Sequence, residues 1–164
     1  MELHISKEIY EKVRQTYGIY FSGISGITPE KLTTDALSLT KPDEQIFILK
    51  KFYPNIEGVK LLEVGSGFAN FLLIARKKYN IDAYAVEPSS DGFGDSDSIA
   101  KKILLENEVD PTVIVDGRGE ALPFPDNGFD ICYSSNVLEH VDDPKKVISE
   151  MIRVTKPGGI IQII

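Results

Sequence analysis

Short apolar runs alternate with segments of helical periodicity from Val59 to the end of the chain. Apolar runs of about four to eight residues bounded by turn residues are typical of buried strands, whereas apolar residues spaced three or four apart mark one face of a helix. The alternation predicts strands joined by helices, and hence a parallel sheet covered on both faces. We expect five strands, at "VKLLEVG", "DAYAVE", "TVIVD", "FDICYSS" and "GGIIQII".

The N-terminal part of the chain predicts two helices separated by an irregular segment. Ser6 fits an N-cap, and the pattern after it predicts a helix from about residue 6 to 17, with Gly18 in the left-handed position that ends it. Residues 22–41 mix Gly, Ser, Thr and Pro without a clear period, so we expect a loop or mobile segment there. Pro42 then fits the first turn of a second helix.

The same pattern suggests how the chain is organised. We expect residues 1–41 to form an N-terminal helix and a lid-like segment, and residues 42–164 to form the domain that contains the alternating strands and helices, while the total length suits one compact unit. Two interpretations stay open for the aromatic residues of the first part, a lid over a substrate or ordinary core packing. These residues are Tyr10, Tyr17, Tyr20 and Phe21.

A candidate binding site lies at the end of the first expected strand, in "LLEVGSGFANFLLIARKK" at positions 61–78. Gly65 and Gly67 lack a Cβ atom, so a ligand can approach the main chain closely there. The helix that we expect from about Ala69 directs its free N–H groups and the positive end of its dipole into the same space. The corner therefore suits a polar or anionic group.

A carboxylate at the end of the second expected strand adds to this signal. Glu87 lies 20 positions after Gly67, where a carboxylate can accept hydrogen bonds from both hydroxyls of a ribose. The two features together indicate a cofactor that contains adenosine. A dinucleotide fingerprint would require glycine at position 70, and the chain has Asn70 there, which disfavours nicotinamide cofactors.

The order of motifs resembles a known family. Glu63, Gly65, Gly67 and Ala69 are followed by Glu87, then by "GRGEALPFPDNGFDICYSSNVLEHV" and "RVTKPGGIIQII". This series is similar to the class I S-adenosylmethionine-dependent methyltransferases, particularly the branch that acts on small molecules, over roughly residues 59–164. The resemblance implies a Rossmann-like, doubly wound α/β fold with five parallel strands in the order 3-2-1-4-5, and S-adenosylmethionine as the cofactor.

The resemblance also implies roles for individual residues. Gly65 and Gly67 would pass close to the methionine part of the cofactor, Glu63 would help hold its amino group, and Glu87 would bind the ribose hydroxyls. The segment from Gly119 to Ala121 would lie beside adenine, and transfer itself would need no metal. The full set implied to bind the cofactor is Glu63, Gly65, Ser66, Gly67, Glu87, Gly119, Glu120, Ala121 and Asn136.

The chain departs from the family pattern in three places. Arg118 stands where relatives usually have an Asp that accepts from the adenine amino group, and Ala69 replaces a usual glycine. Relatives also continue past the fifth strand with a helix and two more strands that complete the sheet and the substrate pocket. Because the chain ends at Ile164, we expect an apolar sheet edge and self-association through residues 160–164, unless the sequence is a fragment or a partner covers this edge.

Composition narrows the expected partners and compartment. The chain has 18 basic and 25 acidic residues, a net charge of −7, and no basic stripe, so we expect no nucleic-acid partner. Cys132 is the only cysteine, which excludes an internal disulfide and predicts a core thiol in a reducing compartment. No signal peptide or membrane-spanning run is evident, so we expect a cytoplasmic protein without a membrane partner.

Three functions therefore remain as hypotheses. The first is a methyltransferase that acts on oxygen, nitrogen or carbon of a small molecule, and the second is a binding module that keeps the cofactor but performs no transfer. The third and weakest is a nicotinamide-dependent oxidoreductase. His140 is a candidate general base, although "LEHVDDP" is also typical of a helix end, and the sequence does not identify the methyl acceptor.

Overall fold

A computed structural model describes residues 4–21, 26–90 and 94–164. Its strands form a single parallel sheet in the order β3-β2-β1-β4-β5. The predicted doubly wound α/β class and strand order are confirmed. The strands are β1 (Lys60–Val64), β2 (Asp82–Glu87), β3 (Ile114–Asp116), β4 (Phe129–Ser134) and β5 (Thr155–Ile163).

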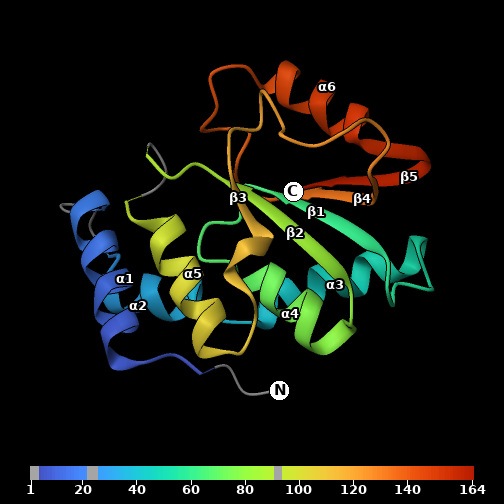
Figure 1. Cartoon of the computed structure of the whole chain (residues 1–164). Coiled ribbons are helices and arrows are strands. Elements are labelled where there is room, and N and C mark those ends of the chain that lie inside the picture. Colours follow the sequence, from blue (N-terminus) through green and yellow to red (C-terminus); the bar gives the residue numbers. More distant parts are fainter. Residues whose placement is uncertain (1–3, 22–25, 91–93) are drawn as a thin grey trace.

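Helices cover the sheet on both faces. In Figure 1, α6 lies on one side of the sheet, and α3, α4 and α5 lie on the other. Figure 1 also shows α1 beside α5, and α2 packs against α1. The helices are α1 (Lys7–Tyr20), α2 (Pro29–Ala36), α3 (Thr40–Phe52), α4 (Asn70–Tyr79), α5 (Ser96–Glu106) and α6 (Pro144–Val154), with a 3₁₀ turn, η1 (Pro111–Val113).

Alternation along β1 divides the core into two clusters. Leu61 packs with the buried residues of α1, α3, α4 and α5, whereas Leu62 and Val64 pack with those of α6. This alternation follows from the period of two in a strand that is buried on both faces. Cys132 lies on the α6 side and is fully buried, as predicted, and burial raises the pKa of its thiol to about 12.

The first helix begins as predicted but continues further. The hydroxyl of Ser6 accepts a hydrogen bond from the N–H of Ile9 at 3.3 Å, which confirms the N-cap. The prediction that Gly18 ends the helix is wrong, because α1 runs through it to Tyr20. A glycine inside a helix costs about 1 kcal/mol relative to alanine. Burial of Ile9 and Val13 in the core, with Tyr17 packed against it, offsets that cost.

Residues 22–41 contain a helix where we expected only a loop. Residues 22–25 lie outside the described residues, but Pro29–Ala36 forms α2. The hydroxyl of Thr28 accepts from the N–H of Lys31 at 3.2 Å, and proline follows at the first helical position. The prediction failed here because this helix buries only Thr33 and so shows no apolar period.

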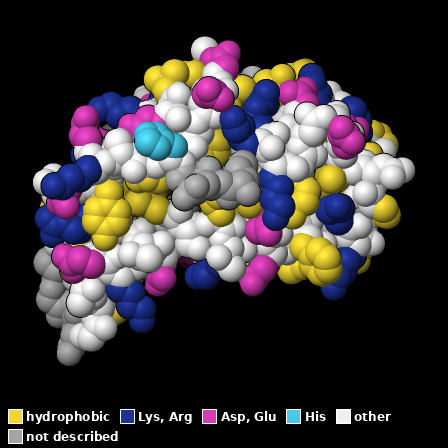
Figure 2. Space-filling view, turned by 90° about the horizontal axis from the view of Figure 1, so that it is seen from below, with side chains coloured by type: hydrophobic (Ala, Val, Ile, Leu, Met, Phe, Trp, Pro, Cys, Tyr) yellow, Lys and Arg dark blue, Asp and Glu magenta, His cyan; other side chains and the backbone are white. Residues whose placement is uncertain are grey.

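The surface mixes charges of both signs. Figure 2 shows Lys and Arg side chains interspersed with Asp and Glu on the face viewed from below. Exposed hydrophobic side chains are also present, among them Phe47, Ile48 and Phe52 of α3. No helix in the described part of the chain has both the length and the apolar character to cross a membrane.

The strand β5 lies at one edge of the sheet. It pairs with β4 on one side and has no second strand neighbour among the described residues. Ile163 and Ile164 are 41% and 51% exposed. An edge strand with unpaired backbone groups beside apolar side chains favours pairing with another chain.

We therefore expect this 164-residue chain to self-associate through β5. Ile163→Lys should reduce the association, because a charged side chain on an edge strand opposes edge-to-edge pairing. Ile152→Lys is the matched control, since Ile152 is 59% exposed but belongs to α6 and not to the edge strand. Light scattering should show smaller particles for Ile163→Lys alone. Equal effects of both substitutions would point to hydrophobic surface in general rather than to β5.

Candidate active site

The chain turns sharply after β1. Gly65, Gly67 and Ala69 have φ angles of 76°, 50° and 60°, which lie in the left-handed region that favours glycine. The N–H of Gly65 donates to the carbonyl of Val86 at 2.9 Å and so fixes the turn to the end of β2. Ala69 is the N-cap residue of α4, so the first N–H groups of α4 face this turn. The predicted turn is present, and we call residues 65–69 the glycine corner.

Glu87 holds the glycine turn from the side of β2. It is 5% exposed, and its Oε2 accepts from the N–H of Gly67 at 3.0 Å. Its Oε1 accepts from the hydroxyl of Ser96, the first residue of α5, at 2.7 Å. Burial raises the pKa of Glu87 above its ordinary value, while the hydrogen bonds from Ser96 and Gly67 oppose the increase. One carboxylate therefore joins β2, the glycine turn and α5.

The segment after β3 packs beside the ends of β1 and β2. A Cβ atom on Gly119 would lie 3.2 Å from Val64 and 3.1 Å from Val147 of α6, so the backbone of Gly119 is close to both. The side chain of Glu120 turns toward α6, because its Oε1 accepts from the N–H of Asp142 at 3.2 Å. The turn closes with a hydrogen bond from the N–H of Ala121 to the carbonyl of residue 118 at 3.1 Å.

The end of β4 closes the corner from the opposite side. Asn136 is exposed, has a φ angle of 53°, and donates its N–H to the carbonyl of Ile164 at 3.0 Å. The next residue, Val137, lies over Gly65, where a Cβ atom would be 2.4 Å from Val137 Cγ2. Position 65 therefore requires glycine for two reasons, its positive φ and the contact with Val137.

The structure thus brings the residues predicted to bind a cofactor to the carboxyl edge of four neighbouring strands. Glu63 lies in β1 and the glycine turn follows it, Glu87 ends β2, Gly119–Ala121 follow β3, and Asn136 follows β4. In open α/β sheets this edge is where ligands bind.

Residues 62–163 match the methyltransferase domain family. The match spans more than half of the 164 residues. The chain belongs to the methyltransferase domain family.

Two individual proteins are similar to this chain over part of their length. A protein named "Uncharacterized methyltransferase" from Mycobacterium sp. (strain KMS) is 36% identical over 108 residues, which cover 63% of this chain and 37% of that protein. The crystal structure of the [4+2]-cyclase SpnF is 27% identical with a TM-score of 0.62, and the match covers 74% of this chain and 43% of that one. The chain spans well under two thirds of the length of both relatives.

A third similarity concerns the fold alone. A putative S-adenosyl-L-methionine-dependent methyltransferase from Methanococcus maripaludis has a TM-score of 0.67 at 18% identity, with 99% of this chain and 66% of that one covered. The Rossmann-like fold of class I methyltransferases that we predicted from the sequence is thereby confirmed.

The glycine corner and the adjoining end of β1 contain buried polar atoms that suit a ligand. Glu63 Oε2 and Ser66 Oγ have no hydrogen-bond partner in the described part of the chain, and the two residues are only 4% and 7% exposed. Buried polar atoms without a partner are rare in folded proteins, so each requires an explanation. A Cβ atom on Gly67 would meet nothing within 4 Å, so there is space beside the turn. These features fit an adenosine cofactor with an amino-acid tail.

Glu63 is the most strongly perturbed acid at the corner. Burial raises its pKa well above the ordinary value, and the negative charge of Glu87 raises it further. The N–H of Leu72, in the first turn of α4, opposes the increase by donating to the carboxyl group. A cationic amino group beside Glu63 would favour the ionised form. Glu63 therefore suits the role that the family resemblance implied.

His140 lies apart from this cluster of buried groups. It is exposed in the turn between β4 and α6, and its backbone N–H donates to the carbonyl of Val137 at 2.9 Å. Its suggested role as a general base stays a prediction. Across residues 4–21, 26–90 and 94–164, no group of three or more His, Cys, Asp or Glu side chains is arranged to hold a metal ion.

Sequence reasoning missed a polar network that reaches the end of β4 from α3. The hydroxyl of Tyr133 donates to Gln45 Oε1 at 2.6 Å, and Gln45 Nε2 donates to the hydroxyl of Ser135 at 3.5 Å. The Tyr133 ring stacks on Phe71 with centroids 3.8 Å apart. The only signal in the sequence was a polar residue one position before the buried Ile46, which is too common to single out Gln45.

Two of the N-terminal aromatic residues, Tyr17 and Tyr20, contact segments near the candidate site. Tyr17 is half-buried and contacts Phe68 of the glycine turn edge to face, with centroids 6.1 Å apart. The hydroxyl of Tyr20 accepts from the N–H of Gly94 at 3.2 Å. The end of α1 is thus packed against the loops of the site, and its function as a lid stays a prediction.

The burial of Glu63 predicts a pH-dependent stability of the ligand-free chain. Because the native pKa is raised, the contribution of this carboxyl to the free energy of unfolding is greatest below the unfolded-state pKa of about 4.3. That contribution is lost as pH rises through the native pKa. Glu63→Gln removes the titration. Its free energy of unfolding relative to wild type should therefore increase between about pH 5 and pH 8, by about 1.4 kcal/mol for each pH unit that lies between about pH 5 and the native pKa.

Urea unfolding at both pH values measures this difference. Glu44→Gln, at an exposed position of α3, is the control for the change in net charge. A Glu63→Gln difference that is the same at both pH values would show that Glu63 is ionised throughout.

Proposed function

We propose that this chain binds S-adenosylmethionine at the glycine corner and transfers its methyl group to a small molecule. The observation that carries the proposal is the buried Glu87 carboxylate, fixed by Gly67 and Ser96 beside a left-handed turn and the N-terminus of α4. A fixed carboxylate and free backbone N–H groups at one corner match the ribose and the polar tail of this cofactor. Membership of the methyltransferase domain family supports the same conclusion.

Each residue of the corner has a role in this proposal. Glu87 accepts from the ribose hydroxyls with the lone pairs that its two protein partners leave unused. Glu63 receives the amino group of the methionine part at its unpartnered oxygen. Residues 119–121 form the wall beside adenine. The cofactor supplies a methyl group already activated by a positively charged sulfur, so the protein mainly aligns the acceptor with it.

Asn70 argues against a nicotinamide cofactor. A dinucleotide site needs glycine at this position for close packing of helix and strand. The Asn70 side chain instead donates to the carbonyl of Ala36 at the end of α2. The position is thus used to join α2 to α4, and the spacing required for a pyrophosphate is absent.

The acceptor site in this proposal lies beyond the end of β4. The groups gathered there, Gln45, Ser135 and Asn136, are polar and uncharged, which suits hydrogen bonding to a small polar acceptor. The net charge of −7 and the mixed charges of the surface in Figure 2 disfavour a nucleic-acid acceptor.

A second function is favoured by one similarity. The relative SpnF is named a [4+2]-cyclase, so a domain of this fold can serve a reaction other than methyl transfer. In that alternative the chain keeps the cofactor site and performs no methyl transfer.

Labelling separates the two functions. The chain is incubated with methyl-labelled S-adenosylmethionine and a cell extract divided by size into small molecules and macromolecules. We expect label in the small-molecule fraction. Label in protein or nucleic acid would refute a small acceptor, and cofactor binding without any transfer would favour the alternative.

The central cofactor contact can be tested with Glu87→Ala. Hydrogen bonds to a charged group contribute about 1.5–3 kcal/mol, so affinity for S-adenosylhomocysteine should fall roughly 10- to 150-fold. Glu44→Ala, at an exposed position of α3, should leave the affinity unchanged. Calorimetry with S-adenosylhomocysteine and with NAD provides the measurement. Tight binding of NAD and none of S-adenosylhomocysteine would overturn the proposed function.

A further inference from the structure

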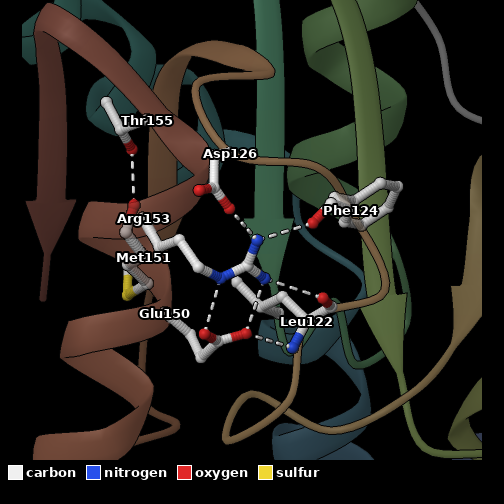
Figure 3. A network of polar contacts seen from close by, with 7 residues as sticks. All are labelled: Leu122, Phe124, Asp126, Glu150, Met151, Arg153 and Thr155. Carbon is white, nitrogen blue, oxygen red and sulfur yellow. Dashed lines mark hydrogen bonds and ion pairs between the residues drawn. The ribbon is translucent and has the colours of Figure 1, made fainter.

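Arg153, near the end of α6, uses every hydrogen-bond donor of its guanidinium group (Figure 3). Nε and Nη2 donate to the two oxygens of Glu150, both at 2.7 Å. Nη2 also donates to the carbonyl of Leu122 at 3.0 Å, and Nη1 donates to the carbonyl of Phe124 and to Asp126 Oδ1, both at 2.8 Å. One side chain of α6 thus binds three positions of the segment that follows β3.

Glu150 completes this contact from the same helix. Its Oε2 also accepts from the backbone N–H of Leu122 at 2.8 Å, so both polar backbone groups of Leu122 are bound by α6. The side chain of Glu150 is 19% exposed and that of Arg153 is 32% exposed. The hydrogen bond from Arg153 lowers the pKa of Glu150 below its ordinary value, which is consistent with a carboxylate that stays ionised in this contact.

The segment from residue 122 to 127 depends on these two side chains because it has little regular structure of its own. It contains Pro123 and Pro125, which have no backbone N–H to donate. The N–H of Asn127 donates to the carbonyl of Arg153 at 2.9 Å, which adds a further contact with the same residue. The polar backbone groups of this segment are therefore satisfied largely by α6.

The segment 122–127 directly follows residues 119–121, which form one side of the proposed cofactor site. Residues 119–121 come directly before Leu122, and Glu120 is itself bound to the turn before α6 through the N–H of Asp142. Gly119 packs against Val147 of the same helix. The position of residues 119–121 is thus set by α6 on both sides.

We propose that Glu150 and Arg153 are positioning residues for the cofactor, which hold residues 119–122 where they contact its adenine ring. This inference rests on the proposed function, and it assigns to α6 a role that the sequence motifs did not suggest. The two side chains act through the backbone of Leu122 and Phe124, and they do not touch the cofactor. The planar fork of arginine is needed for this geometry, so lysine cannot replace it.

The test compares two ligands, S-adenosylhomocysteine and S-ribosylhomocysteine, which lacks the adenine base. For Arg153→Lys and for Glu150→Gln, affinity for S-adenosylhomocysteine should fall about tenfold or more, as expected when charge-assisted hydrogen bonds are lost. Affinity for S-ribosylhomocysteine should stay within about twofold. The ratio of the two affinities, which measures the contribution of adenine, should therefore shrink. A loss of folded protein alone would not change that ratio.

Asp126→Asn is the matched control. Asp126 is 71% exposed, and its substitution leaves four of the five hydrogen bonds donated by Arg153 in place. Its ratio of affinities should equal that of wild type. Glu87→Ala should weaken both ligands equally, since both contain the ribose.

The outcomes separate this inference from the proposed function. If wild type binds S-adenosylhomocysteine and the ratio is unchanged in both Arg153→Lys and Glu150→Gln, the positioning role is wrong and the cofactor assignment stands. If wild type binds neither ligand, the proposed function fails and the positioning role fails with it. Circular dichroism of each variant identifies one that does not fold, and the other variant then decides.

Discussion

The carboxylate of Glu87 is the point on which the geometry of the site depends. A carboxyl group buried at the end of a strand must find hydrogen-bond donors, and here the donors are the N–H of Gly67 and the hydroxyl of Ser96. Meeting this requirement fixes the glycine turn against β2 and α5. The nearby Glu63 has no such compensation at Oε2, and burial raises its pKa strongly. Groups that cost stability in this way are typical of functional sites.

Most of the fold could be predicted from sequence because the central strands β1, β2 and β4 are short apolar runs that are largely buried. The strand at residues 82–87 has the predicted bounds, and the glycine corner follows β1 as expected. The glycine corner could be predicted from sequence because positive φ angles favour glycine. Even Ala69 shows the constraint, since it adopts a φ of 60° where relatives usually have glycine.

What the sequence did not show depends on contacts between distant segments. The helix α2 was missed because Thr28 and Pro29 mark its start but its residues have no apolar period. The hydrogen bonds of Arg153 to residues 122–126 join positions about thirty apart, and no local pattern encodes such pairs. The same holds for Gln45 and Tyr133, which are 88 positions apart. Sequence thus indicated which residues form the corner, and the structure adds those that hold it in place.

Hydrogen exchange with and without S-adenosylhomocysteine tests the central claim, that the cofactor binds at the glycine corner. Bound ligand should slow exchange of the backbone amides at residues 65–69 and 119–122. A hollow of about 600 Å³ between α1 and α2, lined by residues that include Tyr10 and Leu37, serves as the internal comparison and should be unaffected. Protection confined to that hollow, with none at the glycine corner, would contradict the account.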